Sequence, residues 1–313
     1  MDKIKKVFFL TGAGVFVLIA LFIVFKLFVY SAPPQTQDDD GDYYRQMHKN
    51  YIIYSPKIPK QIDFAGENVP IERFDVYQSL DYEMLKIMYW HSEAILYIKR
   101  MPETFAIVEP ILKKYGIPDD FKYLLVTESG MVNVVSPARA EGYWQFLKPT
   151  AIEYGLEVND EVDERYNLEK STEAACKYLK DSYKIFGSWT LAAASYNVGR
   201  DRVKKELLRQ KVNSFYDLLL NRETARYLYR IVAFKIILSN PRDYGFNIRN
   251  ADCYKLPEIT IVKVDTAIPN LIDFAKKFNT NYKIIKKLNP WLRSDKLTNK
   301  NGKIYYLKIP KTN

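Results

Sequence analysis

The sequence predicts a mainly α-helical domain, preceded by a membrane-spanning helix and followed by a small βααβ unit. Three observations support this fold class. An uncharged apolar run of 19 residues lies near the N-terminus, apolar residues recur every three or four positions between residues 82 and 239, and an alternating β-branched pattern begins near residue 259. With 313 residues, of which 48% are hydrophobic and 27% charged, the chain can bury one large core and one small one. Wholesale disorder is excluded.

The first element is the apolar run from Val7 to Phe25, which follows three lysines within the first six residues. A helix rises about 1.5 Å per residue, so this run covers roughly 30 Å, the thickness of the hydrocarbon core of a bilayer. The lysines favour a cytoplasmic N-terminus, which places the rest of the chain on the extracytoplasmic (periplasmic) side of a single-pass anchor in the cell membrane. Residues 1–30 are therefore interpreted as a cytoplasmic tail and transmembrane anchor. The alternative is a cleaved secretory signal, because Ser31 and Ala32 are small.

Residues 31–57 are interpreted as a linker. Within this range, residues 31–41 contain two prolines, polar residues and the acidic triplet 38–40, and offer too few apolar side chains to pack. Residues 50–79 show no regular pattern, and no element is predicted there.

The middle of the chain is predicted to be helical from about residue 82 to residue 239. Pro102 and Pro118 are placed at helix starts, Ser171 is a candidate N-cap, and Pro241 follows a long run as a stop. Residues 58–250 are accordingly assigned to one mainly α domain.

The last part, residues 258–311, is predicted to form a βααβ unit. Residues 259–264 and 303–309 have the strand pattern, and residues 271–278 and 282–288 form two short amphipathic helices. The unit contains only four acidic residues and neither histidine nor cysteine. Nothing in its pattern therefore marks it as catalytic.

The formal net charge of +10 is confined to the two ends of the chain. Residues 258–313 hold 12 Lys and Arg against 4 Asp and Glu, a balance of +8, and the first six residues add +2. The large middle segment is therefore neutral overall, which excludes a basic footprint for nucleic acid there. Two histidines and two cysteines predict neither a metal site nor a disulfide framework, and no cofactor is expected. Whether Cys176 and Cys253 pair is left open, although Cys176 is expected to be a buried small residue.

Glu128 is the candidate for acid–base chemistry. It ends the apolar helical run 124–127 and is followed closely by Gly130, which can release the chain from the helix. Apolar neighbours disfavour a carboxylate, so the pKa of such a group rises and it can hold a proton at neutral pH, as a general acid must. On this segment alone a solvated helix terminus is the more common interpretation of such a glutamate.

Four segments taken together resemble a known family. They are 128–130 (ESG), 135–146 (VSPARAEGYWQF), 192–199 (AAASYNVG) and 222–227 (RETARY). Their order and spacing resemble those of the membrane-bound lytic murein transglycosylase D family, whose catalytic domain has a goose-lysozyme-like helical fold. The terminal βααβ unit resembles a LysM-like peptidoglycan-binding module, on the basis of Asp265–Thr266 and the segment 288–290 (LNP).

The resemblance implies that Glu128 is the only catalytic acid. It would protonate the glycosidic oxygen between N-acetylmuramic acid and N-acetylglucosamine, and then, as a carboxylate, remove the proton of the muramoyl 6-hydroxyl. That hydroxyl would attack C1 of its own ring, giving a 1,6-anhydro end without hydrolysis. Because the nucleophile belongs to the substrate and has a high effective concentration, the second carboxylate of most glycosidases is not needed.

Five further residues acquire substrate-binding roles through the same resemblance. Tyr196 matches a tyrosine whose hydroxyl reaches the catalytic carboxyl, while Ser136 and Gln145 match residues that hold sugar amide and hydroxyl groups. Glu223 matches a supporting glutamate of the cleft, and Asn197 is expected to shape the turn that presents Tyr196.

Two positions depart from the family pattern. Arg139 stands where the family commonly has glycine, and Tyr143 replaces an aliphatic residue or phenylalanine. Arg139 is expected to alter its loop or to add a cationic contact to the muramoyl peptide.

The expected partners are peptidoglycan glycan strands and, through the N-terminal helix, the membrane. Two other functions are open: a goose-type lysozyme-like hydrolase and a non-catalytic peptidoglycan-binding scaffold. If the LysM-like unit only sets affinity for the polymer, its removal at Pro257 should leave turnover of short soluble glycans unchanged.

Overall fold

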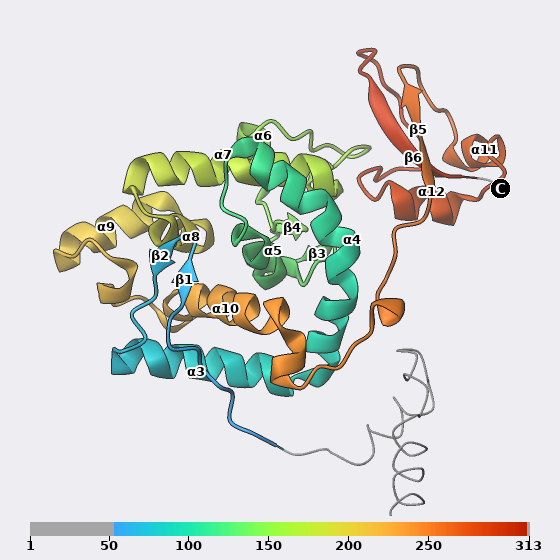
Figure 1. Ribbon diagram of the computed structural model, residues 1–313. Coiled ribbons are helices and arrows are strands. Elements are labelled where there is room, and N and C mark those ends of the chain that lie inside the picture. The colour runs from blue at the N-terminus through green and yellow to red at the C-terminus, as the bar shows by residue number, and fades with distance from the viewer. Residues whose placement is uncertain (1–52, 312–313) are drawn as a thin grey trace, which may run out of the picture. The chain divides into compact units, whose positions relative to one another are not determined.

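The computed structural model describes residues 53–311 (Figure 1). The expected anchor at 1–30, and the linker as far as residue 52, lie outside the described residues. Within residues 53–311, no helix has both the length and the apolar character that crossing a bilayer requires.

The described part is mainly helical and ends in a small unit that contains strands, as predicted. Two short hairpins and eight α-helices lie before the C-terminal unit, within the described residues: β1 (Asp63–Phe64), β2 (Glu67–Asn68), α3 (Phe74–Tyr89), α4 (His91–Tyr115), α5 (Phe121–Ser129), β3 (Val134–Val135), β4 (Glu141–Gly142), α6 (Lys148–Glu153), α7 (Leu168–Phe186), α8 (Trp189–Val198), α9 (Arg200–Gln210) and α10 (Arg222–Ser239). The C-terminal unit consists of β5 (Ile259–Val264), α11 (Leu271–Lys276), α12 (Tyr282–Leu288) and β6 (Tyr305–Pro310).

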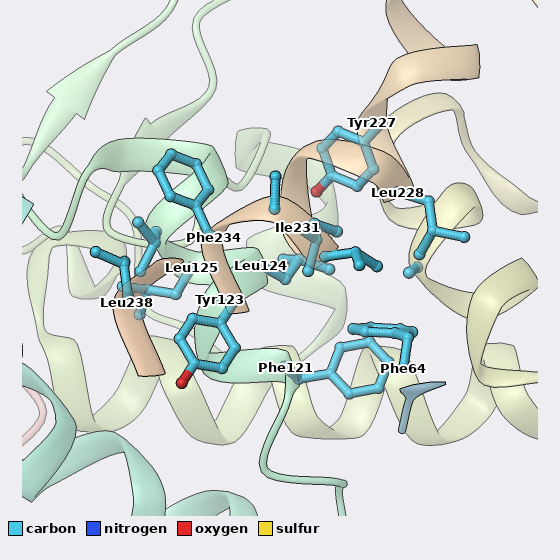
Figure 2. Close-up of a cluster of buried hydrophobic side chains, with 14 of the residues drawn as sticks. Phe64, Phe121, Tyr123, Leu124, Leu125, Tyr227, Leu228, Ile231, Phe234 and Leu238 are labelled. Carbon is cyan, nitrogen blue, oxygen red and sulfur yellow. The ribbon is translucent and has the colours of Figure 1, made fainter. Parts of the chain in front are cut away.

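Helix α5 lies in the core of the helical part. It packs against α4 and α10, and α10 also packs against α3 and α8. Figure 2 shows Leu124 of α5 near Ile231 of α10, and Leu125 of α5 on the side of Leu238; Leu124, Leu125 and Ile231 are completely buried. Close packing of this kind leaves little freedom of movement, so residues on α5 and α10 hold fixed positions relative to one another.

Two of the predicted helix starts are wrong. Pro102 lies inside α4, which already begins at His91 and is held by buried residues on both sides of the proline, so tertiary packing offsets the cost of a proline within a helix. Ser171 lies in the first turns of α7, and the N-cap is Asn167, whose side chain accepts a hydrogen bond from the backbone N–H of Lys170 at 3.0 Å. The stop at Pro241 is confirmed, because α10 ends at Ser239.

The segment 50–79, for which no element is predicted, contains the β1–β2 hairpin and the start of α3. The hairpin strands are two residues long and turn through Ala65 and Gly66, both with positive φ. Two-residue strands are too short to produce an alternating pattern, which is why the sequence does not reveal them.

Two glycines are required by close contacts. Gly130 ends α5 with a φ of 60°, and a Cβ there would lie 2.7 Å from the ring of Tyr97. Gly142 has a φ of 87°, and a Cβ there would lie 2.0 Å from the carbonyl oxygen of Arg165. Larger side chains at these positions would force apart α5 from Tyr97 and β4 from residue 165.

The C-terminal unit has the predicted βααβ order. Strands β5 and β6 pair antiparallel, with Ile259 opposite Pro310 and Val264 opposite Tyr305. Helix α12 and strand β5 have the predicted bounds, whereas α11 ends two residues earlier than expected and β6 begins at Tyr305. The core of the unit includes Leu271, Ile285 and Leu307, all completely buried.

Both cysteines are free thiols. Cys176 is completely buried in α7, as expected for a structural residue, and burial raises the pKa of its thiol to about 12.

Candidate active site

The candidate site is centred on Glu128, in the last turn of α5. The apolar residues that precede it are buried in the core, whereas its own side chain is only partly exposed. The left-handed Gly130 then ends the helix, and Arg100 donates a hydrogen bond to the Gly130 carbonyl at 3.0 Å. The carboxyl group is therefore carried by a rigid, buried helix and still reaches solvent.

Burial raises the pKa of Glu128 from 4.5 to about 7. A hydrogen bond from Tyr227 and the charge of Arg230 act in the opposite direction, and the charge of Glu223 raises the pKa further. At neutral pH this carboxyl group is thus divided between its protonated and ionised forms, which suits a group that must both donate and accept a proton.

Tyr227, on α10, donates a hydrogen bond from its hydroxyl to Oε1 of Glu128. The resemblance gives this contact to Tyr196, but in the structure the hydroxyl hydrogen of Tyr196 is donated elsewhere. The hydroxyl of Tyr196 donates to the backbone carbonyl of Trp144 at 2.7 Å, and its ring packs edge to face against Trp144 and Phe146. Tyr227 lies four residues after Glu223, on the same face of α10, so helical spacing within the last motif was the signal that could have identified it.

Gln145 lies in the segment 134–146, which we call the β3–β4 lobe and which contains both strands and the loop to Phe146. Its backbone has a φ of 51°, and its side-chain amide donates to the carbonyls of Val134 at 3.0 Å and Gly142 at 2.8 Å. Both amide hydrogens are therefore used inside the lobe, so any contact with a substrate must use the amide oxygen as an acceptor.

Ser136 closes a turn in the same lobe. Its hydroxyl accepts a hydrogen bond from the backbone N–H of Ala140 at 2.9 Å, and its own N–H donates to the Ala140 carbonyl. Its contact with a substrate stays a prediction, and its observed role is to hold the turn that contains Arg139.

Asn197 and Glu223 lie where α8 ends and α10 begins. The side-chain oxygen of Asn197 accepts a hydrogen bond from the hydroxyl of Thr224 at 3.0 Å, which joins the two helices. Glu223 is exposed in the first turn of α10, and its charge acts on Glu128 as described above. Their contacts with a substrate also stay predictions.

A buried carboxylate on α3 accompanies the site and was not anticipated from the sequence. Glu83 is 1% exposed and accepts hydrogen bonds from Arg226 at 2.7 Å and from Arg230 at 3.2 Å, both on α10. A buried charge needs such partners. Because Arg230 is paired with Glu83, the negative charge of Glu83 offsets part of the effect of Arg230 on Glu128. This fits a carboxyl group whose pKa stays high.

Arg139 has a φ of 61°, in the left-handed region. This explains why glycine is common at this position in the family that the sequence resembles. A non-glycine residue with this conformation is strained by roughly 1–2 kcal/mol. Glycine would remove this strain, but its greater freedom in the unfolded chain offsets part of the resulting stabilisation.

We expect Arg139→Gly to stabilise the protein by about 0.5–1 kcal/mol in chemical denaturation. The matched control is Arg202→Gly, at an exposed position in α9, which should destabilise by about 1 kcal/mol because glycine disfavours a helix. Equal losses of stability in both variants would refute the strain at Arg139.

Comparison with known proteins identifies two domains. Residues 107–218 match the transglycosylase SLT domain, and residues 260–313 match the soluble lytic transglycosylase C-terminal LysM-like domain. Glu128, Gln145 and Tyr196 lie within the first match, while Tyr227 lies beyond it.

Three curated proteins are similar to the chain. It is 33% identical over 147 residues to the membrane-bound lytic murein transglycosylase D of Escherichia coli strain K12, an alignment that covers 45% of this chain and 32% of that protein. The same values hold for the protein of that name from an E. coli O6:H1 strain. A putative tributyltin chloride resistance protein of an Alteromonas species is 25% identical over 173 residues, which is 53% of this chain and 80% of that protein.

The chain spans 32% of the length of the two E. coli relatives. The two domain matches and the sequence identity over 147 residues point to the same kind of protein. The chain therefore carries a transglycosylase SLT domain and a C-terminal LysM-like domain, and it is homologous to the membrane-bound lytic murein transglycosylase D of E. coli.

Proposed function

We propose that this protein is a lytic transglycosylase that cleaves the β-1,4 bond between N-acetylmuramic acid and N-acetylglucosamine in peptidoglycan. The observation that carries the proposal is a partly exposed glutamate, Glu128, whose pKa lies at about 7 in an SLT domain. The homology to E. coli lytic murein transglycosylase D supports the same reaction class.

In the proposed first step, protonated Glu128 donates its proton to the glycosidic oxygen, and the bond from that oxygen to C1 of the muramoyl ring breaks. The N-acetylglucosamine side leaves with a new hydroxyl group. In the second step the Glu128 carboxylate takes the proton of the muramoyl 6-hydroxyl while O6 bonds to C1. Glu128 is then protonated again, no water is consumed, and the product carries a 1,6-anhydro ring.

The neighbouring residues support both steps. The Tyr227 hydroxyl, which is a donor to Oε1, stabilises the carboxylate between the two proton transfers. The amide oxygen of Gln145 can accept a hydrogen bond from the N–H of a sugar acetamido group. For Ser136, Asn197 and Glu223 we propose contacts with sugar hydroxyls of the bound glycan strand, and for Tyr196 support of the loop that carries Gln145.

The proposed setting is the outer side of the cell membrane. Residues 1–30 would anchor the chain, 31–57 would form the linker, 58–250 would form the goose-lysozyme-like catalytic domain, and 258–311 would bind glycan strands as the LysM-like domain. The charge and apolar pattern of the N-terminus supports this topology.

The test is mass spectrometry of the fragments that the full chain releases from purified sacculi. We expect fragments with 1,6-anhydromuramoyl ends, each lighter by one water molecule than the hydrolysed fragment. Reducing muramoyl ends would instead favour the goose-type lysozyme-like alternative. Binding to sacculi without release of fragments would favour the non-catalytic scaffold.

The rate should depend on pH through Glu128. Because the free enzyme must begin with a protonated Glu128, kcat/KM on soluble glycans without peptide stems should fall about tenfold per pH unit above about pH 7. A rate that is constant from pH 6 to pH 9 would contradict the assigned pKa.

A further inference from the structure

The LysM-like domain shares a core with a segment of the helical part. Val162, 1% exposed, and Tyr166, 6% exposed, belong to the same buried cluster as Trp291 and Leu292 of the LysM-like domain. Arg293 places its guanidinium group over the ring of Tyr166, 4.0 Å from its centre. Without the LysM-like domain, these two apolar side chains would lose much of their cover.

Backbone hydrogen bonds join the same two segments. Val162 pairs with Leu292 in an antiparallel bridge, in which the N–H of Asp163 donates to the Trp291 carbonyl and the N–H of Arg293 donates to the Glu161 carbonyl, both at 2.8 Å. The carboxylate of Glu161 also accepts the backbone N–H of Thr298 at 2.7 Å and its hydroxyl hydrogen. A contact made by backbone bridging fixes orientation as well as proximity.

Charge complementarity accompanies these contacts. Glu157 pairs with Lys303 and accepts a hydrogen bond from the Tyr305 hydroxyl at 3.1 Å, and Glu169 pairs with Lys308. Part of the excess positive charge of the C-terminal unit therefore faces acidic residues of the same chain. Polar pairs at the rim of an apolar contact are typical of a specific interface.

The contacts continue from this segment into the β3–β4 lobe. The hydroxyl of Tyr166 donates to Glu141 at 2.8 Å, and Arg165 is paired with both Glu141 and Asp163. Arg165 also donates to the carbonyl of Phe146 at 3.3 Å. The segment that the LysM-like domain covers is thus bonded to both ends of the loop that carries Gln145.

We infer that the LysM-like domain is a fixed structural partner of the β3–β4 lobe, and that it supports turnover of glycans too short to reach it. The segment 157–166 is the connection: one side contacts the LysM-like domain and the other holds Glu141 and Phe146. This inference argues against the expectation that removal of the unit at Pro257 leaves turnover of short glycans unchanged. Its activity readout rests on the proposed function, whereas its structural readout does not.

The test uses the full chain with Val162→Asp, which places a charge in the shared core. The matched control is Ile261→Asp, which makes a similar change at an exposed position of β5. For Val162→Asp we expect faster hydrogen exchange at the amides of Glu141 and Phe146, which bond to each other across the lobe, and no such change in the control. We also expect kcat on a short soluble glycan to fall about tenfold or more with little change in KM, because a displaced lobe misplaces Gln145.

A second variant excludes simple misfolding. Glu161→Ala removes the side-chain acceptor for Thr298 without burying a charge, and it should produce the same changes to a smaller extent. Exchange at Glu141 and Phe146 that stays at the wild-type rate in both variants would overturn the inference, whatever the wild-type activity proves to be. Faster exchange with unchanged kcat would overturn its catalytic half. If the wild type releases no anhydro product, the proposed function fails and the exchange result still decides the structural partnership.

Discussion

We expect Glu128→Gln to lower the rate of anhydromuropeptide release by about 10⁴-fold or more, because one side chain serves both proton transfers and each such transfer is worth about 10²–10⁴-fold. Glutamine has nearly the same shape but neither donates the proton to the glycosidic oxygen nor takes one from the 6-hydroxyl. Binding to sacculi should be retained, since the substitution leaves the LysM-like domain and the β3–β4 lobe intact. The measurement is quantitative mass spectrometry of released fragments beside a sedimentation assay with sacculi.

The same variant has a stability control whose sign is fixed by the pKa shift. In the folded protein the pKa of Glu128 is raised from 4.5 to about 7, so the ionised carboxylate destabilises the fold as pH rises from about 4.5 through 7. Glutamine removes that penalty, and at pH 8 the variant should be more stable than the wild type by on the order of 3 kcal/mol, with little difference at pH 4. An inactive variant that is also less stable at pH 8 would indicate damage to the fold rather than loss of the acid.

Tyr227→Phe is expected to lower kcat about 10–100-fold. The reason is that it removes a hydrogen bond to a charged group, and such a bond contributes about 1.5–3 kcal/mol. The hydroxyl favours the carboxylate form, so its loss should raise the pKa of Glu128 above about 7 and move the alkaline fall in rate to higher pH. The measurement is the pH profile of kcat/KM on soluble glycans.

Tyr196→Phe is the matched comparison for that prediction. It removes a hydrogen bond to the Trp144 carbonyl, not one to Glu128, so it should lower stability and leave the position of the alkaline fall near that of the wild type. If Tyr196→Phe shifts the profile and Tyr227→Phe does not, the family-based assignment of Tyr196 is correct and the contact between Tyr227 and Glu128 is not the relevant one.

The parts of the fold that could be predicted from the sequence are those fixed by local pattern. The bounds of α12 and β5 follow from apolar spacing within six or seven residues, and the end of α10 follows from Pro241. Pro102 and Ser171 misled the prediction of helix starts because the packing of α4 and the cap at Asn167 decide them, and neither is visible in the residue itself.

In the candidate site, too, some features follow from local sequence and others depend on how the helices pack. The resemblance located Glu128, and the apolar residues next to it in the sequence were enough to indicate a raised pKa. The partner of its carboxyl group, Tyr227, is the last residue of the fourth motif, four positions after Glu223, but which tyrosine meets Glu128 is decided by how α10 lies against α5. Glu83 was missed for a related reason: it comes from α3, which contacts α10 across the core, and buried pairs of this kind are recognised only when both helices are placed.

Helix α10 carries both the hydrogen-bond donor and the cation that act on the Glu128 carboxyl group. One face of this helix presents Tyr227 to Glu128, while Arg226 and Arg230 are held by Glu83 on α3. The hydrogen bond that stabilises the carboxylate and the cation that would lower its pKa therefore belong to one rigid element. The apolar contacts between α5 and α10 (Figure 2) keep the distance between these groups constant.

The most direct test of the role proposed for Glu128 is a titration of its carboxyl group, by ¹³C NMR of side-chain carboxyl carbons in the wild type and in Glu128→Gln. We predict one glutamate signal that titrates near pH 7 in the wild type and is missing from the variant. If the signal that disappears in Glu128→Gln titrates below about pH 5, Glu128 is an ordinary ionised carboxylate at neutral pH and cannot be the proposed acid.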